Sequence, residues 1–119
     1  MPWTYSQSTG ELRHNGVVVA TGYSGLAGPT RNNPDAEDQA NRGPIPRGRY
    51  RIGAPYHNPH TGPHSMDLTP MGHNARGRTA FLIHGDRPDH NASHGCTIFD
   101  HRVRVQISQS GDNILDVVR

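Results

Sequence analysis

The amino-acid sequence predicts a mostly β domain with long loops and one helix near the C-terminus. Short runs in which apolar and polar residues alternate recur along the chain, which is the pattern of half-buried strands. Asn15-Gly16 separates two such runs, and this pair is a strong hairpin signal because both residues tolerate positive φ. Sustained helical spacing occurs only over residues 101–109. With 119 residues and neither a repeat nor a linker, we expect one domain over residues 1–119.

The expected strands are short, and Gly, Pro, Asn or Asp bounds most of them. They cover residues 3–6, 11–13, 17–23, 49–52, 65–69, 79–84, 96–99 and 114–118. Residues 24–43 and 53–64 are rich in Gly, Pro, Asn and His without strand periodicity. This composition predicts exposed loops, the first of which holds one or two helical turns capped by Asn33. Asp100 caps the helix of residues 101–109.

The charge pattern limits the partners. Lys and Arg number 12 and Asp and Glu 10, a formal net charge of +2, and the basic residues are scattered. Nucleic-acid binding needs a basic stripe that releases counterions from phosphates, so we do not expect it. The longest aliphatic run, residues 17–20, is too short for membrane insertion, and the start of the chain has no signal-peptide pattern. We therefore expect a protein made in the cytoplasm without a signal peptide.

The residues that suggest chemistry lie at two strand ends and in the loop between them. His84 closes one apolar run, and Cys96, the one cysteine of the chain, opens the next after Ser93-His94-Gly95. A nucleophilic thiol needs an imidazole that takes its proton and holds the thiolate as an ion pair. Gly95 allows a tight turn that exposes backbone N–H groups to an oxyanion. From the residues alone, a buried inert cysteine and a metal site are the alternatives to a catalytic pair.

This stretch resembles the signature of L,D-transpeptidase (YkuD-like) catalytic domains, in which His-Gly precedes a Ser/Thr-His-Gly-Cys block. His84-Gly85 and residues 93–96 match it. Residues 43–52 are similar to the Pro-x-Pro-x-Gly-x-Phe/Tyr segment of that family, and the two blocks occur in the family's order. Over essentially all 119 residues the chain resembles a compact branch of the superfamily, the L,D-transpeptidase/carboxypeptidase toxins delivered by bacterial type VI secretion.

The resemblance implies a YkuD-like β-sandwich or barrel and a thioacyl-enzyme reaction without a cofactor. Cys96 attacks the meso-diaminopimelate carbonyl of a tetrapeptide stem and releases D-alanine, with His84 as the base. Water then gives L,D-carboxypeptidase activity, and an amine such as a free D-amino acid or another stem gives L,D-transpeptidase activity. The implied role is that of an antibacterial effector in the periplasm of target bacteria. Its partners are peptidoglycan stem peptides, the secretion apparatus and a cognate immunity protein.

The resemblance also gives roles to the residues around the pair. Backbone N–H groups near Gly95 hold the oxyanion, and the Gly85 carbonyl orients the imidazole, with the Asp86 side chain as the alternative. Ser93 orients the loop or donates a hydrogen bond to substrate. His94 is either a second base or a residue that shapes the loop.

Two departures from the family pattern concern the substrate contacts. The interval from His84 to Cys96 is short, so a substrate-capping loop must be reduced. Residues 97–99 replace the usual Ile-Arg pair after the cysteine. A substrate carboxylate must then bind Arg102 or another arginine such as Arg78, or this contact is absent. For Arg78, the alternative is a solvated position on the surface with no role in binding.

Two other functions come from different classes. A zinc-dependent hydrolase would use the His-rich loop, His57, His60 and His64, with Cys96 as a ligand, although the prolines of this loop argue against a helix and favour a solvated loop. A non-catalytic cell-wall-binding module would keep the fold without the chemistry, and the intact His-Cys pair argues against it.

Overall fold

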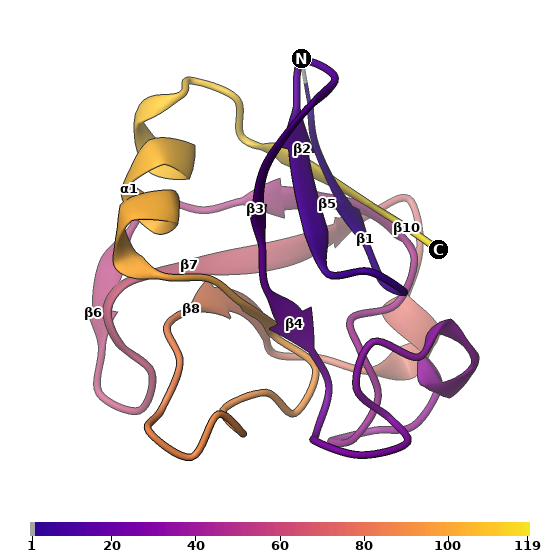
Figure 1. The fold of residues 1–119 in the computed structure, drawn as a ribbon. Helices are drawn as coiled ribbons and strands as arrows, with labels where there is room; N and C mark the ends of the chain where they lie inside the picture. The colour runs from indigo at the N-terminus through magenta and orange to yellow at the C-terminus, as the bar shows by residue number, and fades with distance from the viewer. Residues whose placement is uncertain (1) are drawn as a thin grey trace.

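A computed structural model describes residues 2–119 of the protein. Within this range the elements are β1 (Trp3–Ser6), β2 (Glu11–His14), β3 (Val17–Thr21), β4 (Tyr23–Ser24), β5 (Gly48–Ile52), β6 (Tyr56–Asn58), β7 (Gly62–Met71), β8 (Phe81–His84), β9 (Thr97–Ile98), α1 (His101–Gln109) and β10 (Ile114–Val118). Short 3-10 turns cover Pro34–Ala36 and Ala75–Gly77. The prediction of a mostly β domain with one C-terminal helix is confirmed (Figure 1).

The strands form a nearly closed, barrel-like sheet. Pairing follows the order β3-β2-β1-β10-β5-β7-β8-β9-β4, and β6 pairs with β7. The two ends of this order meet along the chain, because only Gly22 separates β3 from β4. A Cβ atom at Gly22 would overlap the Ile98 carbonyl oxygen and the Phe99 ring, so glycine is required where the sheet returns to itself.

The main differences from the sequence-based expectations are around residues 53–64, predicted as a loop. This segment holds β6 and the first residues of β7, which form a hairpin. Its turn is built by Asn58, whose Oδ1 accepts hydrogen bonds from the His60 and Thr61 N–H groups, and by Gly62 at φ +91°. Residues 79–80 do not belong to β8, since Ala80 at φ +67° interrupts the strand before Phe81.

The core fills the inside of the curled sheet. Its buried side chains are Trp3, Tyr5, Leu12, Ile45, Tyr50, Ile52, Met66, Leu68, Ala75, Phe81, Ile83, Phe99, Val103, Ile107, Leu115 and Val117. The helix α1 packs beside β7 and contributes two of them (Figure 1). Its N-terminus is capped as predicted, with the Val103 N–H donating to Asp100 Oδ1 at 3.0 Å. No helix within residues 2–119 is long and apolar enough to cross a membrane.

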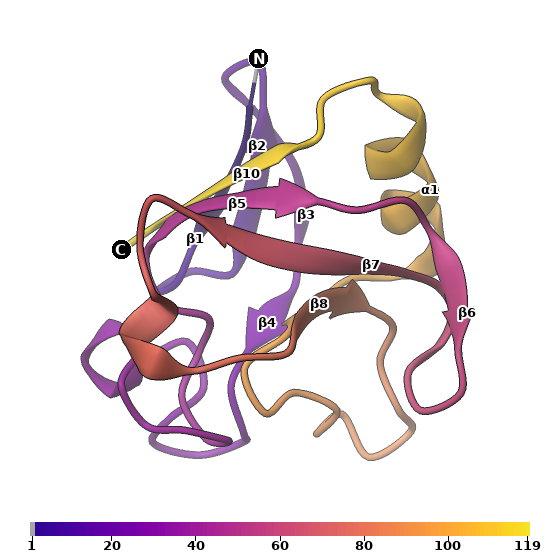
Figure 2. The same cartoon turned by 180° about the vertical axis from the view of Figure 1, so that it is seen from behind.

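Two long loops lie together at the end of the barrel opposite the N-terminus. Figures 1 and 2 both show the segment after β4 beside the segment between β8 and β9. Arg31 joins them, because its Nη2 donates to the His90 carbonyl at 2.6 Å and to Asn91 Oδ1 at 3.3 Å. The loop that connects the two candidate catalytic residues is therefore anchored to the N-terminal half of the chain.

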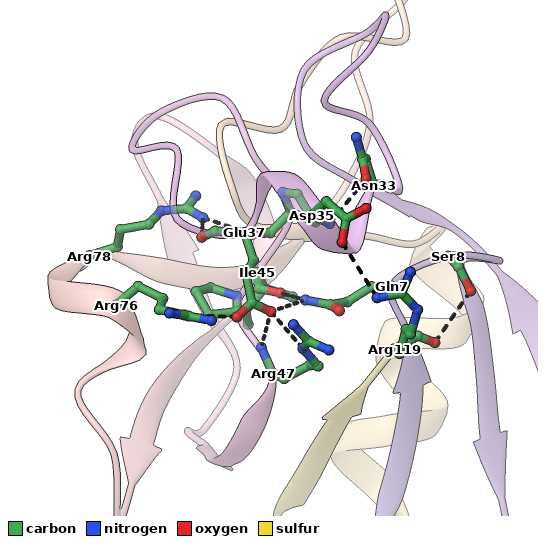
Figure 3. A network of polar contacts seen from close by, with 12 residues as sticks. Gln7, Ser8, Asn33, Asp35, Glu37, Ile45, Arg47, Arg76, Arg78 and Arg119 are labelled. Atoms are coloured by element: carbon green, nitrogen blue, oxygen red, sulfur yellow. Dashed lines mark hydrogen bonds and ion pairs between the residues drawn. The ribbon is translucent and has the colours of Figure 1, made fainter.

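A buried carboxylate, Glu37, fixes the first of these loops to the barrel (Figure 3). Its Oε1 accepts hydrogen bonds from Gln7 Nε2 at 2.9 Å and Arg47 Nε at 2.9 Å, and its Oε2 accepts one from Arg76 Nε at 2.9 Å. Burial raises the pKa of the Glu37 carboxyl, but these bonds outweigh burial and lower it to about 2. The ionised carboxylate thus holds together the residue after β1, the loop before β5 and the segment before β8.

This cluster predicts a loss of stability in acid. Because the pKa falls from 4.5 to about 2 on folding, ionised Glu37 stabilises the fold by about 3 kcal/mol above pH 4.5, and this contribution is lost as the pH falls toward 2. Glu37→Gln should lower the free energy of unfolding at pH 7 by a comparable amount, with a smaller deficit at pH 3, measured by urea denaturation. Glu11→Gln, at an exposed ion pair, is the matched control. A deficit that does not change between pH 7 and pH 3 contradicts this account.

Candidate active site

His84 ends β8, and Cys96 immediately precedes β9, the strand that pairs with β8 in parallel. Ile83 of β8 pairs with Thr97 of β9, and His84 pairs with Ile98. Because side chains alternate along a strand, this register points Ile83 and Thr97 to one face and His84 to the other. Cys96 immediately precedes β9 and belongs to the same face as His84. Strand geometry places the Cα atoms of such diagonal neighbours about 8 Å apart, within reach of an imidazole and a thiol.

The imidazole of His84 is held in one tautomer. His84 is 4% exposed, and its Nδ1 lies 2.8 Å from the Gly85 carbonyl oxygen. A carbonyl only accepts, so Nδ1 carries the hydrogen and Nε2 presents its lone pair. Burial lowers the pKa of His84, the bond to Gly85 opposes this, and the charge of Arg104 lowers the pKa further. His84 is therefore a neutral base whose free nitrogen is Nε2.

The thiol of Cys96 is also neutral at rest. Its Sγ lies 3.8 Å from the Ala80 carbonyl oxygen, and the residue is partly exposed. Burial raises the pKa of this thiol to about 11, although the Leu82 N–H and the charge of Arg78 act to lower it. Burial disfavours the charged form of both groups, which favours a neutral thiol and a neutral imidazole over the expected thiolate–imidazolium pair at rest.

The backbone before Cys96 is braced by buried serines. Ser93 Oγ donates to the Cys96 carbonyl at 2.6 Å and accepts from the Gly95 N–H at 3.1 Å. Ser24 Oγ donates to the Gly95 carbonyl at 3.3 Å, and the Gly25 N–H donates to Ser93 Oγ at 2.9 Å. Ser93 therefore orients the loop, one of its two predicted roles. Because the carbonyl of Gly95 is engaged inside, the N–H across the same trans peptide, that of Cys96, points the opposite way.

Asp86 does not orient the imidazole. Its carboxylate accepts hydrogen bonds from Tyr23 Oη at 2.5 Å and the Arg87 N–H at 2.8 Å, and it lies 2.9 Å from His90 Nδ1. Tyr23 Oη in turn accepts from the Ala92 N–H at 2.9 Å. Of the two orienters considered from sequence, the Gly85 carbonyl has this contact, and Asp86 instead closes the loop between the catalytic residues onto β4.

The two arginines considered as substrate contacts have different environments. Arg78 is 8% exposed, so the prediction of surface solvation is wrong. Its Nη1 donates to the Glu37 and Pro44 carbonyls at 2.6 and 2.8 Å, and its Nη2 to the Gly43 and His94 carbonyls at 3.0 and 3.3 Å. These bonds occupy both terminal nitrogens, which makes Arg78 a brace. Arg102 is exposed on α1 and available to solvent.

A small polar hollow adjoins the loop that leads to Cys96. It has a volume of about 200 Å³ and is lined by Ala40, Asn41, Gly77, Arg78, Thr79 and His94. His94 is exposed at its edge, where it is available to substrate and solvent. A larger hollow of about 370 Å³ lies between the end of β5 and α1 and includes neither candidate catalytic residue, so size does not indicate the site of the chemistry.

A comparison with protein-family models decides the family. The Tlde1 domain matches residues 18–115, a span that includes both His84 and Cys96. The chain belongs to the Tlde1 domain family. Tlde1 proteins are type VI secretion effectors, and the family is one of enzymes. No curated protein sequence matches the chain significantly.

The zinc alternative lacks a site in this Tlde1 domain. Within residues 2–119, no three His, Cys, Asp or Glu side chains gather closely enough to hold a metal ion. His57 and His60 are exposed in the β6–β7 hairpin. His64 turns away from them, and its Nε2 lies 2.8 Å from Ser108 Oγ of α1.

Sequence reasoning missed the residues that support the site from a distance. Ser24 and Tyr23 are far from Cys96 in sequence, and pairing of β4 with β9 brings them beside it. Arg104 is 6% exposed and packs beside Gly85. A helical-wheel count could have found it, because Arg104 lies three residues before buried Ile107 and so shares its face of α1. Nothing local in the sequence indicates the role of Ser24.

Gly95 offers a test of the braced loop. It adopts φ +138°, and an added Cβ atom would overlap Nη2 of Arg78. Gly95→Ala should therefore destabilise the protein by about 2–4 kcal/mol in thermal or urea unfolding. Gly77→Ala is the matched control, because Gly77 has φ +73° with open space around it and its change should cost about 1 kcal/mol. Equal losses for the two variants contradict the packing of Gly95 on Arg78.

The neutral thiol predicts slow alkylation at physiological pH. Only the thiolate reacts with iodoacetamide, so the rate at Cys96 should rise about tenfold per pH unit until it levels off near pH 11. Mass spectrometry of the modified protein over time measures this rate, and Cys96 is the one cysteine that can react. A plateau already reached below pH 7 would show a preformed thiolate and contradict the resting state described above.

Proposed function

We propose that the protein is a cysteine L,D-carboxypeptidase/L,D-transpeptidase that acts on peptidoglycan tetrapeptide stems. The observation that carries this proposal is the position of Cys96 immediately before β9, the strand that pairs in parallel with β8 at His84, with His84 Nε2 available because Gly85 holds Nδ1. A thiol beside a base of fixed tautomer is what acyl transfer requires. Membership in an effector family of enzymes and the His-Gly/Ser-His-Gly-Cys pattern support the substrate class.

The first half-reaction forms a thioester. Rotation about χ1 of Cys96 turns Sγ from Ala80 toward His84, whose Nε2 takes the thiol proton as sulfur attacks the carbonyl carbon of meso-diaminopimelate. The backbone N–H of Cys96 holds the oxyanion, whereas the Gly95 N–H is engaged by Ser93 Oγ. The intermediate collapses with cleavage of the C–N bond, and the proton on Nε2 passes to the nitrogen of the leaving D-alanine.

The second half-reaction reverses these roles. Water, or the amine of a D-amino acid or of another stem, gives a proton to His84 Nε2 and attacks the thioester carbonyl. The C–S bond breaks, and sulfur regains the proton as the thiol. Partial exposure of Cys96 and the adjoining polar hollow leave room for either acceptor. Water gives the carboxypeptidase reaction and an amine gives the exchange or cross-linking reaction.

The proposed biological setting follows from the effector family. Stem peptides lie outside the cytoplasm, so an effector that cuts or exchanges them acts in the periplasm of the target cell. The secretion apparatus delivers it, and a producing cell needs a cognate immunity protein that occupies or covers the thiol site. A non-catalytic wall-binding module would not need the tautomer control at His84, and this contact favours the enzyme.

The test is mass spectrometry of purified tetrapeptide muropeptides incubated with the protein. Wild type should release the terminal D-alanine, and addition of another D-amino acid should give the exchanged stem. Cys96→Ala and His84→Gln should each lower the rate at least about 10³-fold, because each removes one half of the proton-transfer pair.

Controls separate the proposed chemistry from its rivals. His60→Gln changes an exposed histidine of the hairpin and should keep the rate within about twofold, since surface changes of this kind are mild. A chelator should have no effect on a thiol enzyme. Intact stems after incubation with correctly folded wild type, with and without amine acceptors, would overturn the substrate assignment.

A further inference from the structure

Two buried arginines lie near the candidate catalytic residues. Each arginine packs against the glycine that is adjacent in sequence to one of these residues. Arg78 packs on Gly95, beside Cys96, and Arg104 packs on Gly85, beside His84. A buried guanidinium is costly unless its N–H groups are satisfied. Here backbone carbonyls satisfy them, and carbonyls supply hydrogen bonds without cancelling the positive charge. The Asp100 carboxylate also acts on Arg104, but it is exposed and therefore screened. The site is flanked by two guanidiniums that remain charged.

Arg104 connects α1 to three segments of the chain close to the candidate base His84. From α1, its Nε donates to the Phe99 carbonyl at 3.1 Å, and its Nη1 donates to the Pro63 carbonyl at 2.6 Å. Its Nη2 reaches Gly85, where an added Cβ atom would lie only 2.8 Å away. Gly85 is also the residue whose carbonyl holds His84 Nδ1. The guanidinium is thus fixed next to the peptide that orients the imidazole.

We propose that Arg104 is a positioning residue whose fixed positive charge keeps the His84 imidazole neutral in acid and makes the imidazolium, once formed, a stronger acid toward the leaving amine. A cation near an imidazole disfavours its protonated form, and the low dielectric of a buried site strengthens the effect. This inference rests on the proposed function for its catalytic part, whereas the effect on His84 itself does not need a substrate.

The other charges near His84 do not replace Arg104. Asp86 acts to raise the pKa of His84, and Arg87 acts to lower it, but both are exposed and therefore screened. Asp86 is also engaged by Tyr23 and His90. Cys96, which immediately precedes β9, has a thiol whose pKa is raised to about 11 by burial and therefore carries no charge near neutral pH. Arg104 is the buried charge of this set, 6% exposed.

The discriminating variants are Arg104→Gln, which keeps donors and loses the charge, and Arg104→Lys, which keeps the charge. The first measurement is the titration of His84 by NMR of imidazole-labelled protein, with His84→Gln to assign the signal. The midpoint should move to higher pH in Arg104→Gln and stay near the wild-type value in Arg104→Lys. Arg51→Gln, which removes an exposed charge on β5, is the matched control and should not move it.

The second measurement is the pH dependence of kcat/KM for D-alanine release. Arg104→Gln should lose about threefold to tenfold in rate at pH 5 relative to wild type, with a change of less than about twofold at pH 8. An equal loss at all pH values, with an unmoved His84 titration, shows a purely structural role and overturns the inference. A shifted titration in a protein without activity toward muropeptides contradicts the proposed function and leaves the role of Arg104 in place.

Discussion

The parallel pairing of β8 with β9 is the contact on which the candidate site depends. A slip of one residue would exchange the faces of β9, so that Cys96 would point into the core and Thr97 toward the surface. Contacts on both sides of β9 fix the register. The Phe99 N–H donates to the His84 carbonyl at 3.1 Å, and β4 pairs on the opposite side. The position of Cys96, the candidate nucleophile, is therefore set in part by β4, a strand from the N-terminal part of the chain.

Four arginines near the candidate site fall into two pairs with different chemistry. Arg47 and Arg76 share the buried Glu37 carboxylate, whose single negative charge offsets part of their positive charge where they join loop to barrel. Arg78 and Arg104 bond to carbonyls, and their charges persist beside the thiol and the imidazole. Arginine thus forms ion pairs that hold the loops in one place and supplies a positive charge without a carboxylate partner in the other. The difference lies in the acceptor, a carboxylate or a peptide dipole.

Much of this arrangement could be predicted from the sequence because its determinants are local. The Asn15-Gly16 hairpin, the Asp100 cap and the contact of His84 with the adjacent Gly85 each involve residues close in the chain. The β6–β7 hairpin was missed because Pro and His mask strand periodicity in residues 53–64. The neutral state of the thiol and the burial of Arg104 depend on neighbours from distant segments, which a single sequence does not reveal.

A single partly buried cysteine has a consequence for the chemical lifetime of the protein. Peroxide attacks the thiolate in preference to the thiol, and a disulfide needs a second sulfur. Cys96 has no second cysteine in the chain, and burial raises the pKa of its thiol to about 11. In oxidising surroundings the thiol of Cys96 is therefore protected by its own protonation near neutral pH. This protection weakens as the pH rises toward the pKa of the thiol.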